Sequence, residues 1–546
     1  MHELLFAGGE IVDGTGAPSR RADVAVSADR IAAIGDLSRA EAKRRVDCRG
    51  RVLAPGFVDL HSHHDLVLSL APDLQRKYLE GRLRQGITTE IVGNCGLGAF
   101  PVTRESVGQV QALNRFVTPP EAAYEWGSAA EYLDRLERQG TALNVGALLP
   151  HGPLRVAAMG MTSRAPGARE VQAMRQSVRE ATEAGAFGIS FGLIYPPGQF
   201  ASTDEVASLC SALPAGAFAA FHQRSGSAEL IVRAVEEILE VGRRTGRPVH
   251  LSHDHAQGER AWPLLESLLA LGDRARAGGL DYSQDVIPYT GVNTTMLALY
   301  PGWALAEGVE GFLRLARDAK ARARMKEEMA SKVPSWPPWV EGNWCTNLVR
   351  DSGWRAVHVA HAAADPALAG ASAAELARRS GKDPFDAVTD LLLESRGDAT
   401  MLLFGISGDR ENDAPLRTLL SHPTRAIVSD AWECGQAAPH PGAYGAFPRV
   451  LARYVRETRT LTLEEAIRKA SSLPADRLGL RDRGRLAPGA FADLLAFDPE
   501  TVADASTYEA PRAHARGIDW VLVNGVPVVE EGLFRPSTPG RVLRRT

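Results

Sequence analysis

The sequence predicts an α/β fold, a (β/α)8 TIM-like barrel with a small β-sandwich domain built from both ends of the chain. Eight short apolar runs alternate with amphipathic segments in the middle of the chain, a pattern typical of a parallel barrel. Both ends consist instead of short strand-like runs separated by turns. At 546 residues the chain is long enough for more than one domain.

The two terminal segments have the same pattern of short strand-like runs separated by turns. Residues 1–54 contain alternating runs such as 22–26 and tight turns such as Asp13-Gly14. In residues 481–546, Asn524-Gly525 between two valine-rich runs is a strong hairpin signal. Because the N-terminal segment is too short to be clearly a domain by itself, we expect one β-sandwich assembled from residues 1–54 and 481–546.

The barrel is predicted over residues 55–480. Its helical segments carry apolar residues at helical spacing, as in 229–244. The expected strands are 56–59, 88–92, 143–149, 186–191, 217–221, 248–251, 281–287 and 426–429. The alternation breaks at about 300–346, where a charged helical stretch and a stretch rich in proline and tryptophan predict an insertion. Such an insertion is either a lid over the site or an excursion packed on the barrel wall.

Composition narrows the class of partner and compartment. A net charge of -4 without a basic stripe argues against nucleic acid or an anionic membrane surface as partner. The five scattered cysteines do not suggest a disulfide framework, and the N-terminus does not resemble a signal peptide. No apolar run approaches the ~20 residues that a membrane span needs. We expect a cytoplasmic protein that acts on a small molecule; the oligomeric state stays open.

Chemically active side chains follow the ends of the predicted strands. Histidines 61 and 63 project together after the first strand, because residues i and i+2 of a strand share a face. The other strand-end residues are Cys95, His151, His222, His253 and Asp430. Barrel active sites lie at the carboxyl ends of the strands, so these groups would meet at one mouth and form a zinc site. Taken singly, a histidine is more often structural, and Cys95 could be a small buried apolar group.

This constellation resembles the amidohydrolase superfamily, most closely the N-acyl-D-amino-acid deacylase (D-aminoacylase) family. The motifs that carry the resemblance are His61-Ser62-His63, Gly93-Asn94-Cys95-Gly96, Gly192-Leu193-Ile194-Tyr195-Pro196-Pro197-Gly198, Leu251-Ser252-His253, Pro288-Tyr289 and Ser429-Asp430. The likeness spans nearly the whole chain. It implies that Cys95, His222 and His253 hold one zinc tightly, and that His61 and His63 complete a second, weaker metal position.

The distribution of lysine distinguishes this branch from others. Many members of the superfamily bridge two metals with a carboxylated lysine on the fourth strand, but this chain has no lysine between Lys77 and Lys320. Cys95 is the natural substitute, because a thiolate is a good zinc ligand. The missing lysine argues against a cyclic-amide hydrolase of the hydantoinase or dihydroorotase type. A non-catalytic amidohydrolase-like scaffold is the third alternative, although such proteins usually lose metal ligands.

The implied reaction is zinc-dependent hydrolysis of the amide bond of N-acyl-D-amino acids, releasing a carboxylate and a D-amino acid. Zinc lowers the pKa of a bound water towards ~7, which makes that water an effective nucleophile. By the resemblance, Asp430 is the general base that takes a proton from this water and later passes it to the leaving amine. The alternative role for Asp430 is an N-cap of the helix after the strand.

The free carboxylate of such a substrate needs a cation or hydroxyl to bind it. Tyr289 matches a tyrosine with this role in the family. Arg224 and Arg155 are weaker candidates for a cationic contact, and an ion-paired face is an equal alternative for both. Ile194 and Phe191, near the fourth strand end, are candidates for the pocket that takes the substrate side chain, with core packing as the alternative.

Three further positions bear on substrate preference. His151 follows the third strand and is included among the substrate-binding candidates. The family commonly has an arginine where this chain has Gly442, and often a lysine where it has His255. Both departures leave the preferred substrate open, and the number of metals in the working enzyme is also open.

Overall fold

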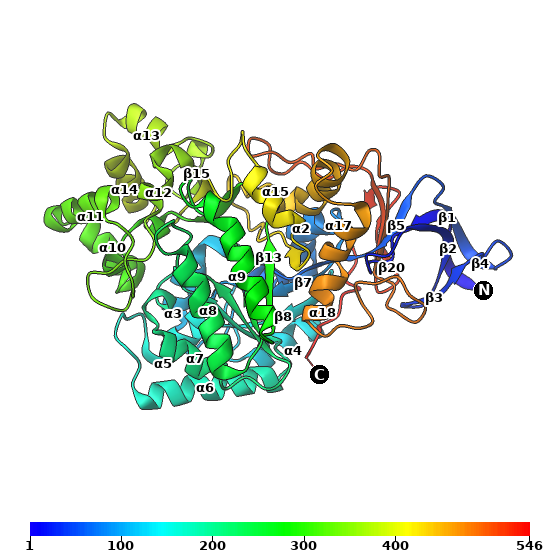
Figure 1. Ribbon diagram of the computed structural model, residues 1–546, viewed down its shortest axis with the longest axis horizontal. Helices are drawn as coiled ribbons and strands as arrows, with labels where there is room; N and C mark the ends of the chain where they lie inside the picture. The colour runs from blue at the N-terminus through cyan, green and yellow to red at the C-terminus, as the bar shows by residue number, and fades with distance from the viewer. Residues whose placement is uncertain (546) are drawn as a thin grey trace.

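The computed structural model describes residues 1–545. The middle of the chain is an α/β structure whose central strands are parallel and are surrounded by helices (Figure 1). The first three of these strands form one sheet: β6 (Phe57–Asp59), β7 (Ile87–Val92) and β8 (Asn144–Ala147). A six-stranded sheet in the order β17-β13-β12-β11-β10-β9 comprises β9 (Leu149–Pro150), β10 (Gly188–Gly192), β11 (Phe218–His222), β12 (Val249–Leu251), β13 (Tyr282–Val286) and β17 (Arg425–Ile427). Each of the eight predicted strand runs overlaps a strand, so this part of the prediction is confirmed.

The two parallel sheets adjoin at both of their edges. One residue, Leu148, separates β8 from β9, and its amide donates to the Val92 carbonyl at 2.9 Å. At the other edge the Asp430 amide donates to the His61 carbonyl at 3.1 Å. These contacts place the carboxyl ends of β6 and β17, which carry the predicted site residues, side by side.

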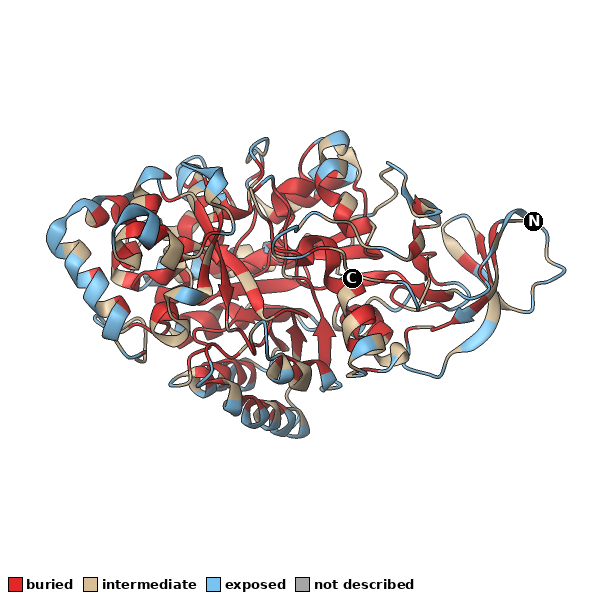
Figure 2. Ribbon diagram, turned by 90° about the horizontal axis from the view of Figure 1, so that it is seen from above, coloured by how far each residue is buried: buried red, intermediate tan, exposed pale blue. Residues whose placement is uncertain are grey.

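Helices flank the parallel strands, and one of them was predicted from its apolar periodicity. The helix predicted at 229–244 is α8 (Ile231–Thr245), which buries one face and ends at Gly246, whose φ of +64° lies in the left-handed region that favours glycine. The others in this part of the chain are α1 (Asp65–Leu68), α2 (Pro72–Leu83), α3 (Val107–Asn114), α4 (Ala129–Gln139), α5 (His151–Met159), α6 (Ala168–Glu183), α7 (Thr203–Cys210), α9 (Leu265–Ala277), α15 (Ala414–Ser421), α16 (Gly442–Arg449), α17 (Leu463–Ala470) and α18 (Ser472–Arg477). Figure 2 shows buried residues concentrated along the central strands and exposed residues on the outer helices.

The two ends of the chain build one nine-stranded sheet. Strand β5 of the N-terminal segment pairs antiparallel with β18 of the C-terminal segment, with Leu53 opposite Ala496. The strands are β1 (His2–Ile11), β2 (Arg20–Ser27), β3 (Arg30–Gly35), β4 (Ala42–Asp47), β5 (Val52–Pro55), β18 (Leu494–Phe497), β19 (Ile518–Val523), β20 (Val526–Glu530) and β21 (Leu533–Phe534). Both ends of the chain therefore contribute to one sheet, and the β-sandwich stays a prediction.

A third unit interrupts the parallel strands between β13 and β17. Its antiparallel sheet consists of β14 (Gly291–Thr295), β16 (Ala399–Phe404) and β15 (Val357–Ala362), in that order. Its helices are α10 (Gly308–Arg317), α11 (Ala319–Ser331), α12 (Leu348–Ser352), α13 (Ala373–Ser380) and α14 (Pro384–Glu394). The unit has its own apolar cluster, and it lies at the opposite end of the molecule from β1–β4 (Figure 1). The insertion expected at about 300–346 lies inside this longer segment.

Among the helices of residues 1–545, none is long and apolar enough to cross a membrane.

Candidate metal centre and active-site cavity

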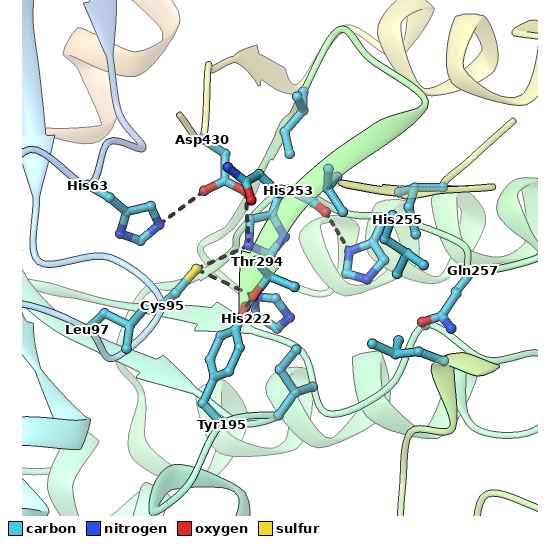
Figure 3. Close-up of a pocket in the computed structure, with 18 of the residues that line it drawn as sticks. His63, Cys95, Leu97, Tyr195, His222, His253, His255, Gln257, Thr294 and Asp430 are labelled. Atoms are coloured by element: carbon cyan, nitrogen blue, oxygen red, sulfur yellow. Dashed lines mark hydrogen bonds and ion pairs between the residues drawn. The ribbon is translucent and has the colours of Figure 1, made fainter. Parts of the chain in front are cut away.

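The carboxyl ends of five parallel strands bring the predicted metal-binding residues close together, and Figure 3 shows His63, Cys95, His222, His253 and Asp430 among them. The Cys95 sulfur is 3.2 Å from His61 Nε2, 3.2 Å from His253 Nε2 and 3.5 Å from His222 Nδ1. Asp430 Oδ1 is 3.2 Å from His61 Nε2 and 3.1 Å from His63 Nε2. One donor atom each from His61, Cys95, His253 and Asp430 lies within 4.8 Å of the others. The structure therefore gathers every residue that the sequence nominated as a metal ligand or general base.

The backbone is strained at three of these residues. Cys95, His253 and Asp430 have φ values of 52°, 33° and 44°, a left-handed region that non-glycine residues rarely occupy. Such conformations cost on the order of 1–3 kcal/mol each and concentrate at functional sites. Gly96 has a φ of 64°, and a Cβ atom on it would lie 2.6 Å from the Gly192 amide nitrogen, so the Cys95 loop needs glycine there.

The protonation state of His222 suits a metal ligand. Burial, followed by the neighbouring imidazoles, lowers the pKa of His222 well below its usual value. A neutral imidazole keeps a free lone pair, which is the form that binds metal. Burial raises the pKa of Asp430, but the positive charges of His61 and His253 outweigh this effect and hold that pKa well below its ordinary value. A thiol, several imidazoles and a carboxylate that converge in a buried site match the donors that zinc takes in proteins.

Asp285 contacts His61 and His253 of this cluster, and also His250 behind it. The sequence analysis did not identify Asp285 as a site residue. Its Oδ2 is 2.8 Å from His250 Nε2 and 3.5 Å from His61 Nδ1, and its Oδ1 accepts the His253 backbone N–H. A carboxylate at Nδ1 of His61 favours the tautomer whose Nε2 lone pair faces Cys95. Asp285 lies near the carboxyl end of the predicted run 281–287, so the strand-end rule applied to that run could have found it.

A buried ion-pair network contacts the residues that follow β17. The Arg82 side chain is fully buried on α2 and donates to Glu90 at 2.5 Å, to Asp59, and to Ser429 Oγ at 2.8 Å. The Ser429 amide in turn donates to Asp59 Oδ1 at 3.1 Å. Because Ser429 precedes Asp430, this network fixes the peptide that carries the carboxylate.

The metal-binding residues open into a small inner cavity of about 60 Å³. It has room for only a few water-sized groups. A cavity of about 400 Å³ adjoins it and shares Leu97, Phe116 and Tyr195 with it. This larger volume falls in the range of small-molecule sites, as does a cavity of about 340 Å³ that shares Ile194 and Thr346 with the inner cavity.

The structure places the residues predicted to contact the substrate in different surroundings, and only some of them line a cavity. Ile194 lines the inner cavity. Phe191 is fully buried in the core, with its ring 5.0 Å from that of Phe221. His151 is also buried, with Nε2 3.3 Å from Glu205 Oε1. Tyr289 lines a separate surface pocket.

Tyr289 and the two arginines have other partners. The Tyr289 ring packs against His440 at 4.8 Å and beneath the Arg449 guanidinium at 4.7 Å. Arg224 is buried and donates to Glu237 at 2.7 Å, because a buried cation requires a nearby carboxylate. Arg155 is likewise buried and lies 3.0 Å from the Glu205 carboxylate. Apart from Ile194, these predicted contacts are therefore outside the inner cavity.

The two positions where the sequence departs from the resembled family also occupy different places. His255 lines the inner cavity, and its Nδ1 lies 2.9 Å from the His253 carbonyl. Gly442 instead starts α16, where a Cβ atom would lie 2.8 Å from His440 Nδ1.

Comparison with known proteins agrees with this geometry over the full chain. The amidohydrolase family profile matches residues 44–529. The chain is 37% identical over 545 residues to the N-acyl-D-glutamate deacylase of Alcaligenes xylosoxydans xylosoxydans, covering 100% of this chain and 96% of the relative. It is 35% identical over 545 residues to the D-aminoacylase of the same organism, covering 100% and 98%.

Solved structures show the same relationship. The N-acyl-D-glutamate deacylase from Bordetella bronchiseptica, complexed with zinc and a phosphonate inhibitor that mimics the tetrahedral intermediate, matches with a TM-score of 0.80 and 33% identity. That match covers 100% of this chain and 99% of the other. The full-length similarity and the profile match together show that this chain belongs to the amidohydrolase family, alongside the D-aminoacylases.

Proposed function

We propose that this protein is a zinc-dependent hydrolase that cleaves the amide bond of N-acyl-D-amino acids, releasing a carboxylate and a D-amino acid. The observation that carries the proposal is the buried convergence of Cys95, four imidazoles and Asp430 at the strand ends. The full-length similarity to named D-amino-acid deacylases supports this choice of substrate class.

In this proposal Cys95, His222 and His253 hold one zinc tightly, and His61 and His63 complete a second, weaker position. The Cys95 sulfur lies 3.2 Å from both His61 Nε2 and His253 Nε2, so it is placed to serve both positions. Bound zinc supplies Lewis-acid polarisation of the amide carbonyl and a lowered pKa for water.

Asp430 is the general base and then the general acid. Its low pKa keeps the carboxylate ionised at neutral pH, so it can accept a proton at the start of the reaction. The proton gained there is passed to the leaving nitrogen when the amide C–N bond breaks. Leu97, Phe116 and Trp432 form part of the wall of the inner cavity around Asp430.

The domain organisation that we infer is a closed (β/α)8 barrel over 55–480, with an insertion at about 300–346, and a β-sandwich of residues 1–54 and 481–546. The adjoining edges of the two parallel sheets support closure. The sandwich is supported by an edge contact between Phe6 and Trp520, whose rings are 5.7 Å apart although β5 and β18 separate their strands in the sheet. Neighbouring strands are about 4.8 Å apart, so the sheet must fold over itself to bring these rings together.

Zinc analysis and a substrate panel test the proposed function. We expect at least one zinc per purified chain, and faster hydrolysis of N-acetyl-D-methionine than of its L enantiomer by at least tenfold. Hydantoin turnover without D-acyl turnover would favour the cyclic-amide alternative. Zinc binding without turnover of any substrate in the panel would favour the scaffold alternative.

A further inference from the structure

A groove of about 550 Å³ lies at the amino ends of three parallel strands. Its lining residues come from 215–216, 242–248 and 274–281, the segments that lead into β11, β12 and β13. The metal cluster uses the other ends of these strands, because His222 is the last residue of β11 and His253 follows β12. A ligand in this amino-end groove would therefore not occupy the site of the proposed reaction.

Three arginines that line the amino-end groove have no acidic partner. Within residues 1–545, the side chains of Arg243, Arg247 and Arg274 form neither an ion pair with a carboxylate nor a hydrogen bond. The Nε atom of Arg247 is also buried. The carboxylate of the groove, Asp281, accepts from Arg477 at 2.6 Å, so its charge is already offset. The groove therefore has an excess of positive charge, although the whole chain has a net charge of -4.

Neighbouring arginines on the same two helices are paired. Arg244, next to Arg243 near the end of α8, donates to Asp204 at 2.6 Å, and Arg276 on α9 also pairs with a carboxylate. The carboxyl end of a helix favours basic side chains, which accounts for single arginines near the ends of α8 and α9. It does not account for Arg247, which lies beyond α8, or for three unpaired guanidinium groups around one groove. An anion bound between these groups would offset their mutual repulsion.

We propose that the amino-end groove binds a small anion that carries two or more linked phosphate groups, with inorganic diphosphate as the simplest member of the class. A guanidinium group can donate two parallel hydrogen bonds to one phosphate, which makes arginine a common partner of phosphate. A diphosphate presents oxygens in several directions and can contact several arginines at once, whereas a carboxylate presents only two oxygens. The volume of the groove falls in the range of small-molecule sites. No bond is made or broken, and the proposal does not depend on the hydrolytic function.

Calorimetric titration of the zinc-loaded protein with sodium diphosphate tests this proposal. We expect a saturable site that binds diphosphate about tenfold more tightly than inorganic phosphate at the same ionic strength. Because salt screens exposed charges, the affinity should fall as sodium chloride is added. Absence of saturable binding, or equal affinities for the two anions, would overturn the proposal.

Single substitutions locate the bound anion. Arg247→Gln and Arg274→Gln should each weaken diphosphate binding about tenfold, because each removes a charged hydrogen-bond donor from the groove. Arg244→Gln is the matched control: it removes the same charge from the end of α8, but its guanidinium is already paired, so the affinity should change less than about twofold. The thermal midpoint of each variant checks that it is folded.

Two results of these titrations would contradict the proposed site. Equal effects of Arg247→Gln and Arg244→Gln would show that net charge, rather than contact in the groove, attracts the anion. Diphosphate bound at the zinc instead would be retained in Arg247→Gln and lost in Cys95→Ser. Either result would overturn the assignment of the anion to the amino-end groove.

Discussion

Asp430 combines an unusual backbone conformation with a carboxylate that contacts two imidazoles. Asp430→Asn replaces one carboxylate oxygen by an NH2 group. The side chain keeps its size but no longer accepts a proton at neutral pH. Because general-base catalysis contributes roughly 10²–10⁴-fold, turnover should fall by about that factor. Zinc content and the unfolding temperature should stay close to those of the unsubstituted protein. Near-normal turnover would contradict the assignment of Asp430 as the base.

Cys95 lies within 3.5 Å of three imidazoles, which makes it the residue on which the metal site depends most. In Cys95→Ser the hydroxyl stays protonated at neutral pH and is a poor zinc ligand. We expect zinc to be lost on dialysis against a chelator, as measured by elemental analysis. Cys48→Ser is the matched control, because Cys48 is a buried thiol in the terminal sheet and its substitution should leave zinc bound. Equal zinc retention by both variants would contradict the site.

Lys469 should make stability depend on pH. Burial lowers the pKa of Lys469 to about 7, whereas an unfolded lysine titrates near ~10.4. Between these values the unfolded chain binds more protons, so stability rises with pH, by up to about 1.4 kcal/mol per pH unit from this group. Urea unfolding from pH 7 to 9 should show this slope, and Lys469→Met should flatten it. Identical slopes in the two proteins would contradict the expectation.

At the scale of the element, helix α2 matters because it carries Arg82 between the buried carboxylates of Asp59 and Glu90. Arg82→Met would leave Asp59 and Glu90 buried without their cation, which should cost about 3–5 kcal/mol in the free energy of unfolding. Arg76→Met on the same helix is the control, since Arg76 pairs with Asp73, whose side chain is 91% exposed. That substitution should cost less than about 1 kcal/mol. Similar costs for both variants would show that the buried network is not what stabilises this end of β17.

Local sequence predicts where a strand lies in the chain better than it predicts which sheet that strand joins. The eight predicted runs that overlap parallel strands are short apolar stretches bounded by turns or helical segments, so their positions follow from local pattern. Strands β14, β15 and β16 carry similar local signals, but they pair with one another rather than with the parallel strands. Local pattern does not specify the sheet that a strand joins, because pairing depends on contacts far apart in the chain.

At the scale of the whole molecule, the C-terminal tail connects the terminal sheet to the parallel strands. The Gly540 amide donates to Thr141 at 2.9 Å, and Val145 both donates to Arg541 at 2.9 Å and accepts from Leu543 at 2.7 Å. Each such bond contributes roughly 0.5–1.5 kcal/mol. Deleting residues 540–546 should therefore lower the thermal midpoint by several degrees while zinc stays bound. An unchanged midpoint would contradict a stabilising role for the tail.

The sequence by itself predicted the parallel strands and the side chains that converge at their carboxyl ends. Both are local properties, because each of these side chains lies at the end of its strand or within four residues of it, and parallel strand ends meet at one edge. Only the tertiary structure decided what surrounds that cluster. Arg224 pairs with Glu237, Tyr289 lies against His440, and Asn293 reaches the cavity from a separate antiparallel sheet. The physical reason is that cavity walls form where distant segments pack, and each buried charge there turns to the nearest partner that offsets its desolvation.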